Sequence, residues 1–533
     1  MWGVKLQMRR EITCAGLVIV LSVGAIAGWR DTLPRPVYED CPAFVDLYYR
    51  AWEIAHDRMG CQPGIPSPRY MDEVFWDDRI WIWDTCFMAH FCKYCPWEFP
   101  GIESLENFYG VMLADADAEP ILVSGEKCSN MGRGVNLPFL VHHPDNPPLF
   151  AWTEYVYALQ MGDRSRLEKV FVEKRWLQRW YDLFESFDPE AKPPQGAYRK
   201  ALIKRYPDGY SWDGNASGMD NTPRGRKGPK DVGKASRCPD NPDLRWVDAY
   251  AQQGLAALYM SKIADLLGRA DEAAQWRARY EAAKAKINDL YWDKGDSFYY
   301  DILGSDRSKV RVMTPASFWP ALAEMPDRDM MSAMERYLRD ANALGGEIPV
   351  VTVARNDLDF NPKGGYWRGG VWLPTTYMTV KALDAYGDHG LAREIALKTL
   401  ERMQRTYVNY EPHTIWECYS PTADKPSTDK VDTKFARPDF CGWSALGPIS
   451  LFIEDVIGIK EADAFRNELT CVFPEEVKGV FGVENYRFGR VCCSVKVTAG
   501  EILVESNRPF VLVANGIRHE AKDGKNRFER NRQ

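Results

Sequence analysis

The chain has 533 residues, of which 45% are hydrophobic and 27% are charged, so it carries enough apolar sequence for a large buried core. Its formal net charge is −7, and no basic cluster of the kind that follows phosphates occurs, which argues against a nucleic-acid partner. The unusual feature is the aromatic content, with 19 Trp, 26 Tyr and 23 Phe.

The first 27 residues have the pattern of a signal peptide. Lys5, Arg9 and Arg10 supply positive charge, an apolar run covers 12–26, and Ala25-Ile26-Ala27 is a small-x-small cleavage sequence. The apolar run is short for a membrane span. We therefore expect export to the periplasm or the extracellular space, with an uncleaved signal anchor as the alternative and no other membrane contact.

The cysteines give no clear metal or redox signal. Twelve of the 13 follow the expected cleavage site, and an exported protein can pair them as disulfides. The spacing of Cys92 and Cys95 is a weak motif, because no second pair with this spacing accompanies it and the chain has only 7 His. Buried or paired thiols are the simpler interpretation, and we predict neither a metal site nor a cofactor.

Amphipathic helices separated by aromatic-rich loops extend from about residue 41 to 459. The segment 270–291 is the strongest, with helix-favouring residues and apolar positions at helical spacing. A short strand is expected near 298–302, but the βαβ alternation of a parallel sheet is missing. The chain is therefore predicted to be mainly α. Further helices are expected at 43–59, 85–94, 148–161, 166–187, 244–267, 327–340, 371–386, 391–407 and 443–457.

The pattern changes after Gly458-Ile459. The segments 491–497, 501–506 and 509–515 are rich in β-branched residues and are separated by turn residues. They predict a small β-domain over 460–533, which follows a helical domain over 28–459. The charged segment 520–533 is expected to be frayed.

A long loop over 209–241 contains the first candidate catalytic acid, Asp220. Gly218 permits a close backbone approach before it, and Pro223 stiffens the chain after it. A carboxylic acid whose pKa is raised by its surroundings can protonate a leaving oxygen. A carboxylate that only stabilises a turn or a helix N-terminus is the alternative for Asp220.

Glu417 is the second candidate, with Trp416 and Tyr419 beside it and a proline at the end of its loop. It is able to deprotonate a water molecule opposite Asp220, and a solvated loop glutamate is the alternative. Two carboxyl groups on opposite walls of an aromatic pocket are what hydrolysis of a glycosidic bond requires.

Two further segments provide candidate binding groups. Trp367 and Arg368 lie in a glycine-rich stretch before a predicted helix, where Arg368 can hold hydroxyl groups or instead form a structural pair with an aspartate. Trp83 and Asp84 lie at another helix start, where Asp84 can accept two hydroxyl groups or act as an N-cap.

At these motifs the chain resembles the trehalase-like clan of inverting α-glycosidases, glycoside hydrolase families 37 and 63, which includes trehalases, processing α-glucosidases and mannosylglycerate hydrolases. The sequence SGMDNTPR at 217–224 resembles the general-acid motif, and WECY at 416–419 resembles the segment of the catalytic base. The sequence YWRGGVW at 366–372 resembles a subsite segment, WDT at 83–85 a sugar-contacting segment, and GWSALGP at 442–448 the motif that opens the last barrel helix.

The resemblance implies an (α/α)6 toroid that acts on an α-linked oligosaccharide or small glycoside with inversion. Asp220 would be the acid and Glu417 the base, with their carboxyl groups roughly 6.5–9.5 Å apart. The substrate-binding residues would be Trp83, Asp84, Arg224, Trp367, Arg368, Trp416 and Tyr419.

The substrate stays open. Met219 stands where trehalases usually have Trp, and the residues of the motif are more similar to those of mannosylglycerate hydrolase. The basic stretch 214–236 either favours an anionic sugar or is a solvated loop. The alternatives are a non-catalytic glycan-binding toroid and another toroid sugar enzyme, such as a uronyl hydrolase or an epimerase.

Overall fold

The computed structural model describes residues 28–61, 65–73, 80–112, 147–190, 203–234 and 236–530. The expected signal peptide at 1–27 lies outside the described residues. Within these ranges no helix is both long and apolar enough to cross a membrane.

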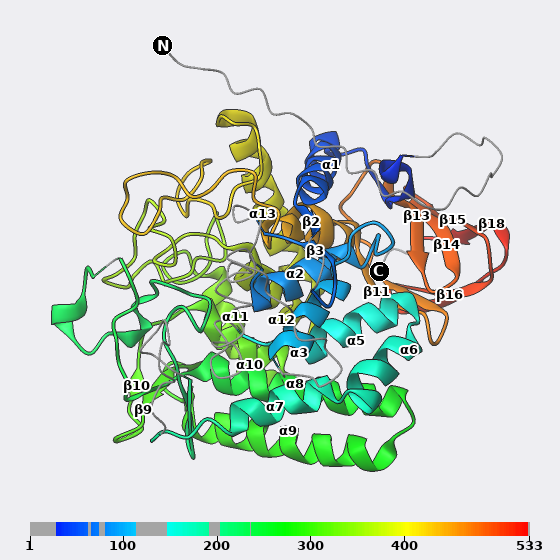
Figure 1. Cartoon of the computed structure of the whole chain (residues 1–533). Coiled ribbons are helices and arrows are strands. Elements are labelled where there is room, and N and C mark those ends of the chain that lie inside the picture. The colour runs from blue at the N-terminus through cyan, green and yellow to red at the C-terminus, as the bar shows by residue number, and fades with distance from the viewer. Residues whose placement is uncertain are drawn as a thin grey trace.

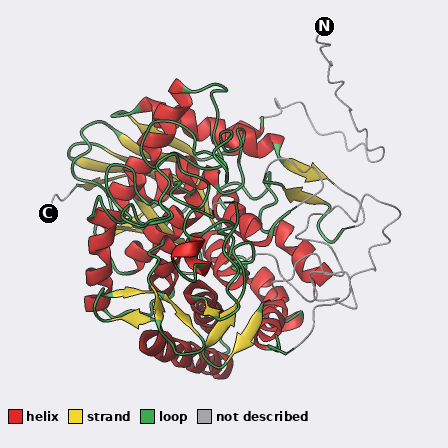
Figure 2. Ribbon diagram, turned by 90° about the vertical axis from the view of Figure 1, so that its left-hand side faces the viewer, coloured by secondary structure: helices red, strands yellow, loops and turns green. Residues whose placement is uncertain are grey.

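Helices form most of the body up to residue 457, and Figure 2 shows them through the middle of the molecule, with strands at several places along its edge. Most lie where the sequence pattern predicts them. They are α1 (Pro42–Asp57), α2 (Ile82–Cys92), α3 (Glu106–Met112), α5 (Phe150–Met161), α6 (Arg164–Leu167), α7 (Trp176–Glu185), α8 (Val247–Leu266), α9 (Ala270–Leu290), α10 (Trp319–Leu322), α11 (Arg328–Arg339), α12 (Leu373–Ala385) and α13 (His389–Asn409), with π-helical turns at η4 (Glu168–Glu173) and η9 (Gly447–Ile457).

Local sequence sets several helix boundaries. The side chains of Asp327 and Asp388 accept hydrogen bonds from backbone N–H groups in the first turns of α11 and α13. The helix expected over 166–187 is instead divided into α6, η4 and α7. Arg175, which precedes α7, has φ = 51°, and this left-handed residue interrupts the helical hydrogen bonds.

The centre of the body is made by helices that are buried on every side. Every residue of α2 and of η9 is buried, as is most of α12. The N-terminal ends of these elements meet in a cluster of tryptophans, in which the ring centroids of Trp83 and Trp443 are 6.1 Å apart and those of Trp372 and Trp443 are 5.4 Å apart. Three segments that are distant in sequence therefore present their first turns to one place.

The C-terminal part forms two sheets, which Figure 1 shows as orange and red strands at one side of the helical body. The order of the first is β1 (Arg35–Tyr38), β13 (Phe481–Phe488), β14 (Val491–Val497), β15 (Glu501–Ser506) and β18 (Gly524–Glu529). The order of the second is β11 (Ile459–Asp463), β12 (Glu468–Cys471), β16 (Phe510–Ala514) and β17 (Ile517–Ala521). A C-terminal sheet domain is thus present, and the N-terminal strand β1 joins it.

The expectation of a frayed end was wrong for most of 520–533. Strand β18 pairs antiparallel with β15 over its whole length, and β17 pairs with β16. Exposure alternates along β18, and the charged side chains of Lys525, Arg527 and Glu529 all take the exposed positions, so the strand forms its backbone ladder while its charges remain in water.

Short hairpins and ribbons complete the fold. The strand expected near 298–302 is two strands, β8 (Phe298–Tyr299) and β9 (Asp301–Leu303). The others are β2 (Met59–Cys61), β3 (Arg69–Met71), β4 (Lys204–Tyr206), β5 (Gly209–Ser211), β6 (Leu244–Arg245), β7 (Trp292–Asp293) and β10 (Lys309–Val310). Every cysteine in the described ranges is free, including the buried Cys92 and Cys95.

Candidate active site

The backbone around Glu417 is fixed from three sides. Its N–H donates to the carbonyl of Arg437 at 2.9 Å, and its carbonyl accepts from Trp443 Nε1 and from Ser444 Oγ, each at 3.1 Å. The side chain is not the solvated loop carboxylate of the alternative interpretation, because the residue is 1% exposed. Its position is therefore set by the N-terminal end of the η9 region.

Two groups hold the Glu417 carboxylate. The Tyr366 hydroxyl donates to Oε1 at 2.8 Å, and the Arg437 backbone N–H donates to Oε2 at 3.3 Å. Burial raises the pKa of this carboxyl, while the Arg437 guanidinium and the Tyr366 hydroxyl oppose that rise and Asp220 adds to it. The Glu417 carboxylate is thus a proton acceptor of raised basicity in a buried part of the site.

Asp220 is partly open, in contrast to Glu417, and is placed by its loop. The Asp220 carbonyl accepts from Cys238 N–H at 3.0 Å. The next residue, Asn221, donates to the Gly365 carbonyl at 3.0 Å and accepts from Trp367 N–H at 2.9 Å. This buried amide ties the Asp220 loop to the segment that carries Tyr366.

The carboxyl group of Asp220 contacts a lysine that no sequence motif singles out. Lys430 Nζ donates to Oδ2 at 2.6 Å, and the lysine side chain is 35% exposed. Its loop is fixed by Thr428, whose hydroxyl accepts from Gly365 N–H at 3.0 Å. Asp220 is therefore not the turn-stabilising carboxylate of the alternative interpretation, because its side chain bonds across to another loop.

Asp84 is a third carboxyl of the same site. It lies in the first turn of α2 and is 3% exposed, and the N-cap of this helix is Trp81 rather than Asp84. Burial raises its pKa well above the ordinary range, and the charges of Asp220 and Glu417 raise it further. Three carboxyl groups from three distant segments therefore interact electrostatically around one space.

Sequence reasoning missed two more charged groups here. Burial raises the pKa of Glu73 well above normal, with Asp72 and Asp84 adding to the rise. Arg437 lowers the pKa values of Glu73, Asp84 and Glu417. Neither residue lies in a distinctive motif. Each reaches the site through tertiary packing, which the local sequence does not reveal.

Aromatic rings form one wall of the site. Trp367 stacks on Trp372 with centroids 3.9 Å apart, and Trp83 lies 5.9 Å from Trp367. Trp83 also covers Gly218, where an added Cβ would lie 2.2 Å from the indole ring. Glycine is thus required directly before the Asp220 segment, both for this approach and for its φ of 78°.

Trp416 and Tyr419 lie in the wall behind Glu417. Both are buried, and the Tyr419 hydroxyl accepts from the Trp416 backbone N–H at 3.1 Å. The Tyr419 backbone also forms two hydrogen bonds with Val371. In this structure, Tyr419 holds the loop in shape.

The two arginines predicted to bind substrate have partners inside the protein. Arg224 is 1% exposed, and its guanidinium forms hydrogen bonds with both oxygens of Asp248 and both oxygens of Asp301. Arg368 pairs with Asp359 and donates to the Lys234 carbonyl. For Arg368 this is the structural Arg–Asp pair that the sequence left open, and Arg224 has no free donor edge for a sugar.

The rest of the basic stretch is also largely neutralised from within. Arg226 pairs with Asp357 and Asp359, and Lys234 pairs with Asp231. The cations that act on the candidate catalytic carboxyls in the described ranges come from elsewhere, namely Arg437 at Glu417 and Lys430 at Asp220. No grouping of His, Cys, Asp and Glu suited to a metal ion occurs in the described ranges.

Comparisons with known proteins agree with this chemistry. The family model of the mannosylglycerate hydrolase MGH1-like glycoside hydrolase domain matches residues 142–437. An uncharacterized protein of Borreliella burgdorferi is 24% identical over 92% of this chain and 95% of its own length. A probable mannosyl-oligosaccharide glucosidase of Schizosaccharomyces pombe is 22% identical over 76% of this chain, which spans only 51% of that protein.

A solved structure shows the same fold. The GH63 mannosylglycerate hydrolase of Thermus thermophilus in complex with glucose superposes with a TM-score of 0.53 and 19% identity, over 76% of this chain and 99% of that one. The family match covers both candidate catalytic carboxyls and more than half of the chain. The chain therefore belongs to the MGH1-like glycoside hydrolase family.

Proposed function

We propose that the chain is an exported inverting α-glycosidase built on an (α/α)6 toroid, and that it cleaves an α-linked glucoside or mannoside. The observation that carries the proposal is the placement of Glu417. It is a buried carboxyl held by Tyr366 and Arg437, and it interacts electrostatically with the partly open carboxyl of Asp220. Inverting glycoside hydrolases use two carboxyl groups in this way, one as general base and the other as general acid.

In the proposed reaction Asp220 protonates the leaving oxygen. Lys430 contacts Oδ2, so Oδ1 is left to carry the acidic proton. Glu417 accepts a proton from a water molecule, which attacks the anomeric carbon from the face opposite the leaving group. The C–O bond breaks as the new one forms, and the product has the opposite anomeric configuration.

The remaining groups bind the sugar. Asp84 accepts hydrogen bonds from hydroxyl groups, and Trp83 and Trp367 cover the apolar face of the ring. The substrate class is supported by the relatives, whose names include glucosidase and mannosylglycerate hydrolase. Arg437 and Lys430 are the cations available to an anionic aglycone.

The test compares wild type with Asp220→Asn and Glu417→Gln on α-glucosides and α-mannosides that include trehalose, kojibiose, nigerose and mannosylglycerate. NMR identifies the first anomer released, and Glu401→Gln, on the exposed face of α13, is the control. We expect β-anomer from wild type and control, and no turnover by either catalytic variant. First release of the α-anomer, or turnover that survives both substitutions, would refute the assignment.

A fluoride substrate separates the two roles. An α-glycosyl fluoride has a leaving group that needs little protonation, so Asp220→Asn should hydrolyse it at a substantial fraction of the wild-type rate. Glu417→Gln should not, because the water still needs a base. The reverse result would exchange the two roles.

Export is supported by the N-terminal sequence pattern alone. We propose cleavage after Ala27, so that mass spectrometry of the protein from an exporting host should find Gly28 as the first residue. Retention of the first 27 residues in a membrane fraction would indicate the signal anchor instead.

A further inference from the structure

A cavity lies away from the carboxyl groups of Asp220 and Glu417, at the other end of the central helices. Its volume is about 360 Å³. Helix α2 carries Asp84 in its first turn, whereas Lys93 and Tyr94, which follow its last turn, line the cavity. In α12 the lining residues Lys381 and Asp384 are likewise near the C-terminal end. An 11-residue helix such as α2 is about 16 Å long, which sets the scale of the separation.

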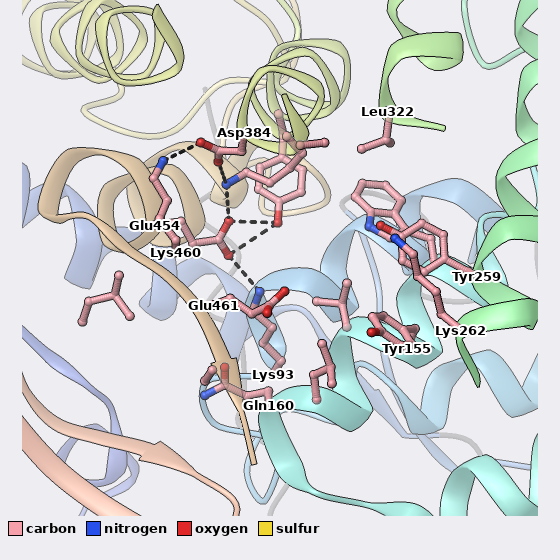
Figure 3. Close-up of a pocket in the computed structure, with 18 of the residues that line it drawn as sticks. Lys93, Tyr155, Gln160, Tyr259, Lys262, Leu322, Asp384, Glu454, Lys460 and Glu461 are labelled. Carbon is pink, nitrogen blue, oxygen red and sulfur yellow. Dashed lines mark hydrogen bonds and ion pairs between the residues drawn. The ribbon is translucent and has the colours of Figure 1, made fainter. Parts of the chain in front are cut away.

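The charged groups on one side of this cavity neutralise one another, as Figure 3 shows. Lys93 pairs with Glu454 at 2.8 Å, and Lys460 pairs with Asp384 at 2.7 Å. Lys381 pairs with Asp384, Glu454 and the adjacent Asp455. Lysines at the C-terminal ends of helices also offset the negative end of the helix dipoles. This side therefore provides a rigid polar wall without a surplus charge.

The opposite side is aromatic. Tyr155 on α5 and Tyr259 on α8 meet edge to face with centroids 5.3 Å apart, and Lys262, paired with Glu324, lies over the Tyr259 ring. Neither phenol hydroxyl forms a hydrogen bond within the described part of the chain, and both tyrosines line the cavity. The pair thus offers two apolar ring surfaces and two polar tips to a ligand.

A β-bulge adds one more polar group. The register of β11 against β12 shifts between Ile459 and Glu461, so that the consecutive residues Lys460 and Glu461 both line the cavity. Lys460 is paired, whereas Glu461 is exposed and forms no hydrogen bond or ion pair within the described ranges. Bulges often redirect side chains toward binding sites.

From this arrangement we infer a second binding site for a small neutral polyhydroxylated ligand, of the size of one or two sugar rings. Hydroxyl groups both donate and accept, so they satisfy the Glu461 carboxyl and the two phenols together, and the apolar face of a sugar ring fits the tyrosine pair. The volume lies at the lower end of the range for ligand pockets. Each of the four lysines in the described lining is paired with a carboxylate, so an anionic ligand would find no free cation, and the exposed Glu461 is open to water and needs no cationic partner.

The test is hydrogen–deuterium exchange of the segments 150–161 and 459–463 with D-glucose and D-mannose as probes. D-Glucuronate and D-glucosamine are charged probes of matched size. The protein is the full chain carrying Glu417→Gln, and binding at the Asp220 and Glu417 end is followed separately in peptides that contain Trp83. The lining variant is Tyr155→Phe/Tyr259→Phe, and Tyr407→Phe on α13, a partly buried tyrosine outside the cavity, is its control.

We expect glucose or mannose to slow exchange in both segments. The lining variant should raise the half-saturating sugar concentration by about tenfold, because two hydrogen bonds are lost while the fold and the rings are kept. The Tyr407→Phe control should leave it unchanged. If the sugars give no protection from exchange, or if the protection is the same in the lining variant, the proposed binding site is wrong. If glucuronate or glucosamine protects more strongly than glucose and mannose, the ligand is not neutral.

Discussion

The hydroxyl group of Tyr366 donates a hydrogen bond of 2.8 Å to Oε1 of Glu417. Tyr366 reaches this position from a backbone with φ = 67°, and its N–H donates to the Thr428 carbonyl at 2.9 Å. The loop that contacts Asp220 through Lys430 and the residue that holds Glu417 are thus parts of one assembly.

Removal of this hydrogen bond should move the acidic limb of the pH–rate profile. A general base works when ionised, and the Tyr366 hydroxyl stabilises the ionised form of Glu417 and so lowers its pKa. In Tyr366→Phe that pKa rises, so activity should begin at higher pH. We also expect kcat to fall by about tenfold, because a hydrogen bond to a charged group contributes about 1.5–3 kcal/mol.

Arg437→Gln should shift the same limb in the same direction, because Arg437 also lowers the pKa of Glu417. Tyr410→Phe, whose ring packs on Phe435, is the control. The profile of kcat against pH measures the effect. An unchanged limb in both variants would mean that Glu417 is not the group that titrates.

The effect of the contact between Gly218 and Trp83 can be distinguished from the effect of backbone strain by a pair of alanine variants. Gly218 and Gly233 have φ values of 78° and 82° in the same loop, but only at Gly218 would a Cβ meet a neighbour. Both alanine variants should lose roughly 1–2 kcal/mol of stability to backbone strain, and Gly218→Ala should lose about 1–3 kcal/mol more because its Cβ meets Trp83. Only Gly218→Ala should displace Trp83 and lower kcat/KM, by about a hundredfold if the shift approaches 1 Å. Equal kinetic losses would show that the Trp83 contact is unimportant.

Asn221→Ala should affect both stability and catalysis. The variant loses two buried hydrogen bonds, which together are worth about 1–3 kcal/mol. It also releases the Asp220 loop from the Tyr366 segment, so kcat should fall while KM changes little. Urea unfolding and steady-state kinetics test this, with the exposed Asn342→Ala as control. A loss of stability with unchanged kcat would limit Asn221 to a structural role.

Arg224 should behave as a structural residue. Arg224→Met leaves the buried carboxylates of Asp248 and Asp301 without their partner, and we expect the free energy of unfolding to fall by about 3–5 kcal/mol. Addition of Asp248→Asn and Asp301→Asn should restore part of this loss. Under conditions in which the variant is folded, KM should stay near the wild-type value. A large rise in KM with little loss of stability would instead support the substrate-binding role.

Local sequence patterns predicted most helices and three strands of the C-terminal domain, because periodic burial of apolar side chains is a local property of each segment. They failed where a long-range pairing decides the structure. Strand β18 is charged and would not be predicted as ordered from its composition, yet its backbone pairs with β15. The division of 166–187 similarly depends on one left-handed residue, Arg175.

The same distinction applies to the site. Sequence motifs were enough to identify the family, the segments around Asp220, Glu417 and Asp84, and the aromatic character of the wall, because these residues stand in recognisable local contexts. The pairing of Arg224 and Arg368 with internal aspartates became visible only in three dimensions, as did the approach of Lys430, Arg437 and Glu73 to the carboxyl groups of the candidate site. Electrostatic interactions depend on distance and burial in three dimensions, and residues far apart in the chain come close and become buried only when the helices pack.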